Sequence, residues 1–136
     1  MKCFGWKIER SRVFGLIERP VAEIFLEDSV GDWQPIVVYV DSGADVTVLK
    51  KSFGEVLGID MEKGEKAAFG EVSGAKIETY VHNMKLRIGD HIVKARVAFA
   101  TDDTPPNLLG RMGIFNLFEI HFRNRTHETC LSKKSV

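Results

Sequence analysis

The segment of this chain best suited to chemistry is Asp41-Ser42-Gly43, which follows an apolar run at 37–40. β-Branched and aromatic residues such as those in the run favour a buried strand, and Asp-Ser-Gly favours a tight turn. The sequence therefore predicts a carboxylate held at the end of a strand, where it can exchange protons with a substrate. An isolated Asp-Ser-Gly is more often only a turn, so the rest of the chain has to decide between these two interpretations.

One carboxylate is not enough to hydrolyse a peptide bond without a metal or a covalent nucleophile. One group must take a proton from water, while a second, kept protonated, hydrogen-bonds the carbonyl oxygen. The chain has no second Asp-Ser/Thr-Gly: Asp28-Ser29-Val30 lacks the glycine, and Asp102-Asp103-Thr104-Pro105 is a proline-containing loop. A residue on the two-fold axis of a dimer meets its own copy. We therefore expect the site to lie between two copies of this chain.

A second motif, Leu108-Leu109-Gly110-Arg111, follows a polar loop that contains two prolines. The paired leucines suit a short buried strand, and Gly110 allows close approach of another backbone segment. Alone, this motif is weak evidence for any function.

Together the two motifs make the chain resemble the retropepsins, the retroviral-type aspartic proteases, and their single-domain cellular relatives. The order also matches: apolar-Asp-Ser-Gly-Ala, a hairpin, apolar-apolar-Gly-Arg and a short helix, within roughly Val13–Phe122. The resemblance implies that Asp41 is catalytic and that Ser42 hydrogen-bonds across the two-fold axis. It also implies that Gly43 brings the backbone close to the substrate.

The resemblance further implies a set of residues that support the active-site loop. Asp45 and Arg111 correspond to an ion pair beside the catalytic loop, although two solvated charges are the alternative. Leu108 and Leu109 correspond to a strand beneath that loop. The expected supporting residues are Ser42, Gly43, Ala44, Asp45, Thr47 and Arg111.

Short apolar segments separated by glycine, aspartate or proline predict an all-β fold. With the resemblance, the expected architecture is a closed acid-protease (retropepsin-like) β-barrel with one or two short helices, assembled as a homodimer. The predicted strands are Val13–Ile17, Val21–Leu26, Ile36–Val40, Val46–Leu49, Lys66–Val72, Ala75–Val81, Met84–Ile88, Ile92–Ala98 and Glu119–Phe122. The predicted helices are Lys50–Leu57, closed by Gly58, and Met112–Phe118.

Turn residues are predicted to connect these strands at 29–32 and 89–90, and Ser73-Gly74 predicts a tight hairpin. That hairpin is the candidate flap over a substrate, although an ordinary surface turn is the alternative. Its expected substrate-binding residues are Gly70, Glu71, Val72, Ser73 and Gly74.

The length of 136 residues predicts a single domain, 1–136, with a core at about 12–123. Residues 124–136 are expected to be either a frayed tail or a strand that pairs with another subunit. Two cysteines, Cys3 and Cys130, lie near opposite ends of the chain; two free thiols are favoured over a disulfide.

Composition excludes several classes of partner. Nineteen basic and nineteen acidic side chains cancel, which predicts no binding to nucleic acid or to an anionic membrane. No apolar stretch is long enough for a membrane helix and none resembles a secretory signal, so a cytoplasmic location is the default expectation. The four histidines lack metal-ligand spacing, and we expect neither a metal nor another cofactor.

The sequence therefore predicts a homodimeric aspartic endopeptidase that acts on a peptide or protein substrate. The main alternative is a dimerisation or peptide-binding module that keeps the fold without catalysis. A third interpretation is that a different chain supplies the second aspartate.

Overall fold

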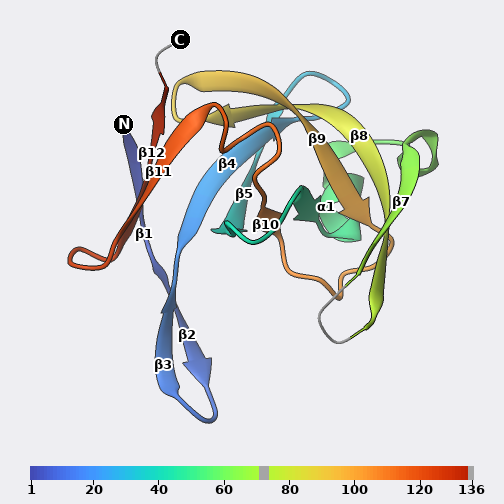
Figure 1. Ribbon diagram of the computed structural model, residues 1–136. Coiled ribbons are helices and arrows are strands. Elements are labelled where there is room, and N and C mark those ends of the chain that lie inside the picture. Colours follow the sequence, from blue (N-terminus) through green and yellow to red (C-terminus); the bar gives the residue numbers. More distant parts are fainter. Residues whose placement is uncertain (71–73, 135–136) are drawn as a thin grey trace.

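The computed structural model describes residues 1–70 and 74–134, and most of these residues belong to β-strands. One seven-stranded sheet has the order β4-β5-β10-β6-β9-β8-β7, and pairing of β4 with β8 closes all but β7 into a six-strand barrel (Figure 1). The strands are β4 (Val21–Glu27), β5 (Trp33–Val40), β6 (Thr47–Leu49), β7 (Glu65–Gly70), β8 (Lys76–Ile88), β9 (His91–Ala100) and β10 (Leu108–Leu109). The prediction of an all-β closed barrel is confirmed.

The hydrophobic core fills this barrel. Along the second half of β8, buried Met84, Leu86 and Ile88 alternate with more exposed residues, as expected for a strand with one face toward the core. The helix α1 (Lys51–Leu57) contributes Phe53 and Leu57 to the buried residues, and a short 3-10 helix, η1 (Met61–Lys63), follows it. Gly58 ends α1 in the left-handed conformation with φ of 68°, as predicted.

The predicted helix Met112–Phe118 is wrong. Residues 112–117 form successive turns, in which the Phe115 N–H donates to the Arg111 carbonyl and the Phe118 N–H donates to the Ile114 carbonyl. Gly113 interrupts any continuous helix because its φ is 78°, and a Cβ there would lie 3.0 Å from the Cβ of Ala95. Close packing against β9 therefore accounts for the glycine.

Two predicted strands are in fact one. Ala75–Val81 and Met84–Ile88 both belong to β8, because His82 and Asn83 continue the ladder opposite Val97 and Arg96 of β9. The turns predicted at 29–32 and 89–90 are present, with positive φ at Gly31 and Gly89.

The turn after β4 is organised by the carboxylate of Asp28. This carboxylate accepts hydrogen bonds from the Gln34 side chain at 3.0 Å and from the backbone N–H groups of Asp32 and Val30. The Gln34 hydrogen bond, followed by those of the backbone, lowers the pKa of Asp28 below its ordinary value. The turn is therefore better held when this carboxylate is ionised.

The ends of the described chain form a separate sheet in the order β1-β12-β11, made of β1 (Lys2–Gly5), β11 (Phe118–Arg123) and β12 (Glu128–Lys133). The sequence did not predict β1, and it offered a strand within residues 124–136 only as one of two alternatives. The last segment was expected to fray or to pair with another subunit, but β12 lies between β1 and β11 of the same chain.

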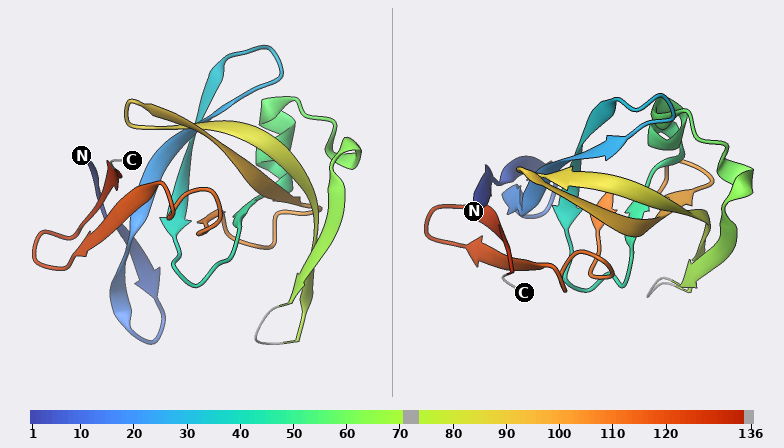
Figure 2. Two further views of the ribbon diagram at one scale, coloured as in Figure 1. Left: turned by 45° about the horizontal axis from the view of Figure 1, so that its top comes forward. Right: turned by 90° about the horizontal axis from the view of Figure 1, so that it is seen from above.

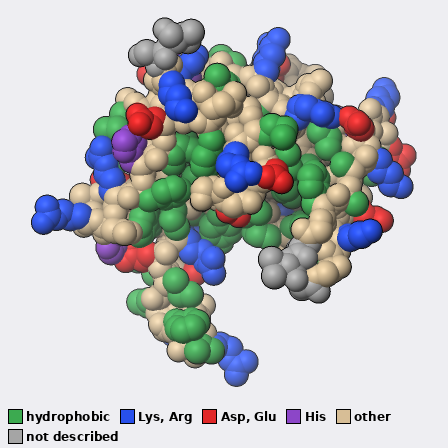
Figure 3. Space-filling view, in the orientation of Figure 1, with side chains coloured by type: hydrophobic (Ala, Val, Ile, Leu, Met, Phe, Trp, Pro, Cys, Tyr) green, Lys and Arg blue, Asp and Glu red, His purple; other side chains and the backbone are tan. Residues whose placement is uncertain are grey.

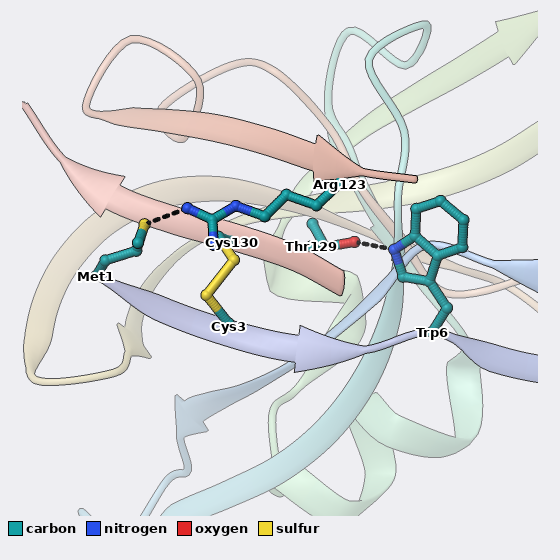
Figure 4. Close-up of a disulfide and its surroundings, with 6 residues drawn as sticks. All are labelled: Met1, Cys3, Trp6, Arg123, Thr129 and Cys130. Atoms are coloured by element: carbon teal, nitrogen blue, oxygen red, sulfur yellow. Dashed lines mark hydrogen bonds between the residues drawn. A yellow bond between two sulfur atoms is a disulfide. The ribbon is translucent and has the colours of Figure 1, made fainter. Parts of the chain in front are cut away.

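A disulfide joins Cys3 of β1 to Cys130 of β12, so the prediction of two free thiols is wrong (Figure 4). The two cysteines are direct partners across the antiparallel ladder, an arrangement that their separation of 127 residues did not reveal. Beside them, the Trp6 indole N–H donates to the Thr129 hydroxyl at 3.0 Å.

A second addition to the barrel is the hairpin of β2 (Lys7–Ser11) and β3 (Gly15–Arg19), which projects from the body of the molecule (Figures 1 and 2). The predicted strand Val13–Ile17 begins two residues too early. The Ser11 hydroxyl accepts hydrogen bonds from the backbone N–H groups of Val13 and Phe14, which places both residues in the turn.

Among the described residues, no helix is long and apolar enough to cross a membrane.

Candidate active site

Asp41 lies directly after β5, on the loop that leads to β6. The Asp41 backbone N–H donates to the Leu109 carbonyl at 3.0 Å, and the Gly43 N–H donates to the Asp41 Oδ1 at 2.8 Å. The strand β10 lies between β5 and β6, parallel to the first and antiparallel to the second. The half-buried carboxylate is therefore fixed by backbone contacts at the end of a barrel strand.

Arg111 holds the far side of this loop. Its backbone N–H donates to the Ala44 carbonyl at 2.9 Å, and its Nη1 donates to the Ser42 carbonyl at 3.1 Å. Its Nη2 forms an ion pair with Asp45, and the Met112 N–H donates to the Asp45 carbonyl. Both charged side chains are largely exposed, so the ion pair adds little stability by itself. Its contribution is to the position of the loop.

Thr47 and Gly110 form the buried contact beneath the loop. The Gly110 N–H donates to the Thr47 hydroxyl at 3.1 Å, and both residues are buried. A Cβ on Gly110 would lie 2.2 Å from the carbonyl oxygen of Val46. Only glycine allows this approach, and the approach brings the second motif against the strand that follows Asp41.

The sequence analysis did not single out three residues that lie near Asp41: Glu9, Arg19 and Tyr39. The Tyr39 hydroxyl donates to the Glu9 carboxylate, and Arg19 Nε lies 3.0 Å from Glu9 Oε2. The shared hydrogen bond lowers the pKa of Glu9 and raises that of Tyr39. No sequence motif links these positions, because the contact joins the added hairpin to β5.

These residues border a cavity of about 380 Å³ that includes Asp41. Its lining residues are Glu9, Arg19, Pro20, Tyr39, Val40, Asp41, Pro106 and Leu108. A larger groove of about 940 Å³ lies elsewhere, between the terminal sheet and the outer side of β4, and Asp41 does not line it. We identify the site by the position of Asp41 and not by cavity size.

Within the described part of the chain, no group of three or more His, Cys, Asp and Glu side chains is arranged to hold a metal ion.

The candidate flap is only partly described. The strands β7 and β8 pair as an antiparallel hairpin with Gly70 opposite Lys76, and Gly74 has φ of 87°. Glu71, Val72 and Ser73 lie outside the described residues. The described strands extend on the same side of the barrel as the loop that carries Asp41 (Figure 1).

Comparison with known proteins identifies the family. The family model for the gag-polyprotein putative aspartyl proteases matches residues 30–114, which include the Asp41 loop, the hairpin of β7 and β8, and Arg111. The chain belongs to this family. It is also similar to the solved structure of EIAV protease complexed with the inhibitor HBY-793, with 26% sequence identity and a TM-score of 0.53. That match covers 74% of this chain and 86% of the EIAV protease chain. No curated protein sequence matches significantly. The retropepsin-like resemblance and fold are therefore confirmed.

Proposed function

We propose that the protein is an aspartic endopeptidase that works as a homodimer, with Asp41 and its copy in the partner as the catalytic pair. The observation that carries this proposal is the position of Asp41, half-buried and held by backbone hydrogen bonds beside a cavity. Each chain offers one such carboxylate, while hydrolysis by this route needs two. Membership of an aspartyl protease family supports the same conclusion.

The two carboxylates would share one proton, because like charges about 3 Å apart cannot both ionise readily. The ionised Asp41 removes a proton from water, and the water oxygen bonds to the peptide carbonyl carbon. The protonated Asp41 donates its hydrogen to the carbonyl oxygen as the tetrahedral intermediate forms. When the carbon–nitrogen bond breaks, the Asp41 that took the proton from water gives it to the leaving amine. A hydroxyl of the intermediate returns its proton to the other Asp41, so the pair again shares one proton.

The supporting residues have roles that follow from their contacts. Arg111 and Asp45 hold the loop that contains Ser42, Gly43 and Ala44, while Thr47 anchors Gly110. A peptide would lie extended across the cleft between the subunits, under the flap residues 70–74. We expect an apolar side chain next to the scissile bond, because Val40, Pro106 and Leu108 line the cavity beside Asp41.

The test compares wild-type protein with the Asp41→Asn variant, which preserves the shape of the side chain. Both are incubated with a mixed peptide library from acidic to neutral pH, with and without a statine-type transition-state mimic, and new termini are identified by mass spectrometry. We expect cleavage by wild type only, inhibited by the mimic and falling per chain on dilution. Equal cleavage by both proteins would contradict the assignment of Asp41. A dimer that binds peptides without cleaving them would favour a binding module.

A further inference from the structure

The hairpin of β2 and β3 is the part of the structure that the proposed chemistry leaves unexplained. It lies at residues 7–19, outside the segment matched by the family model. Among the described residues, its two strands form a ladder with each other and with no third strand. A two-stranded hairpin is marginally stable in water unless it packs against something else. Within the described part of the chain, no third strand therefore supports this hairpin.

The hairpin exposes large apolar side chains at its tip and on one face. Val13 and Phe14, in the turn, are 83% and 81% exposed, while Ile8 and Leu16, on the strands, are 62% and 69% exposed. Ile8 and Leu16 lie on the same face, because Leu16 pairs with Arg10, two residues along from Ile8. Figure 3 shows these hydrophobic atoms gathered at the projecting end of the molecule. Several exposed apolar side chains on one projecting element are typical of an interaction site.

The base of the hairpin is attached next to the catalytic loop. Glu9 accepts the hydrogen bond of Tyr39, two residues before Asp41, and pairs with Arg19. On the other side of the hairpin, Glu18 pairs with His127 in the turn before β12. These contacts attach the hairpin to both the barrel and the terminal sheet, so its direction is set relative to Asp41.

The direction of the hairpin identifies its partner. In Figure 1 and in the left view of Figure 2, the hairpin and the described ends of β7 and β8 extend on the same side of the barrel, with the loop from β5 to β6 between them. A two-fold dimer that brings two Asp41 loops together places the second chain against this side. An element that projects past the loop then lies alongside that second chain.

We infer that the β2–β3 hairpin is a dimerisation arm, which buries Ile8, Val13, Phe14 and Leu16 against a second copy of this chain. The inference rests on the proposed homodimer and goes beyond it by naming an interface element outside the family match. Because a two-fold interface is isologous, each dimer contains this contact twice.

The test uses the full chain with the double substitution Val13→Ser and Phe14→Ser. Both side chains are exposed in the single chain, so the variant should fold with an unchanged circular dichroism spectrum. The matched control is Val30→Ser with Val56→Ser, two exposed valines at 79% and 58% that lie outside the hairpin. Dimer dissociation constants are measured by sedimentation, without reference to proteolysis. If the substitutions weaken each of the two arm contacts about tenfold, the dissociation constant of the dimer should rise about a hundredfold, because both contacts are lost together.

We expect the arm variant to dissociate at much higher concentration than wild type and control, and to recover cleavage when concentrated. Dissociation constants within about threefold of wild type would overturn the inference. So would a wild-type protein that stays monomeric, or one whose hairpin binds phosphatidylcholine–phosphatidylserine vesicles while the dimer is unaffected. A dimer weakened by the arm substitutions in a protein that cleaves nothing would uphold the arm and refute the protease. Cleavage by a protein whose dimer is unaffected by the arm substitutions would uphold the protease and refute the arm.

Discussion

Gly110→Ala tests whether the close contact beneath the active-site loop is required. The added Cβ would lie 2.2 Å from the Val46 carbonyl oxygen, 2.3 Å from the Val46 carbonyl carbon and 2.9 Å from the Thr47 nitrogen. These are backbone atoms inside the sheet, so the strand on one side must move by about 1 Å to restore normal contacts. That movement also stretches the buried Gly110–Thr47 hydrogen bond. We expect the free energy of unfolding to fall by about 3–4 kcal/mol.

The assay is urea unfolding followed by circular dichroism, with thermal unfolding as a second readout. The expected loss corresponds to a fall in Tm of about 10 °C or more. Gly5→Ala is the matched control, because a Cβ at Gly5 meets no heavy atom within 4 Å, and its effect should stay within about 0.5 kcal/mol. If Gly110→Ala were as stable as this control, the contact would not be as close as the structure has it.

Three further predictions follow from individual contacts. Thr47→Val keeps the shape but leaves the buried Gly110 N–H unpaired, so urea unfolding should show a loss of about 1–3 kcal/mol; an unchanged midpoint would contradict this. The folded-state pKa of Asp28 lies below its unfolded value, so its contribution to stability is present at neutral pH and lost as the pH falls through the folded-state pKa. The stability advantage of wild type over Asp28→Asn should therefore shrink below about pH 5; a constant difference would refute the role of that carboxylate. Replacing Cys3 and Cys130 together with serine should lower the free energy of unfolding by about 2–4 kcal/mol under non-reducing conditions; equal stability would argue against the disulfide.

Local chemistry accounts for what could be predicted from the sequence. The apolar run before Asp41 and the glycine at 110 specify a strand, a turn and a close backbone approach by themselves. The helix predicted before Gly58 is present as α1, because this glycine ends the helix in the left-handed conformation. The structure contains the strand before Asp41, the turn after it and the close approach of Gly110 that these residues predict.

Features that depend on tertiary contacts were missed. The helix predicted after Arg111 fails because Gly113 packs against β9, a contact between distant segments. The disulfide depends on the register between the first and last strands, which a separation of 127 residues conceals. The contact of Glu9 with Tyr39 depends on a hairpin whose strands were only partly predicted. In each case the feature depends on a contact with a residue that is distant in the sequence.

The most direct test of the central claim, that two copies of Asp41 form one active site, is a subunit-mixing experiment. Wild-type and Asp41→Asn chains are mixed in equal amounts at fixed total concentration, allowed to exchange, and assayed on a peptide that wild type cleaves. If both carboxylates of a dimer are required, the mixture should retain about one quarter of the wild-type activity, because only wild-type pairs are active. Retention of about one half, the result for chains that each act alone, would contradict the account.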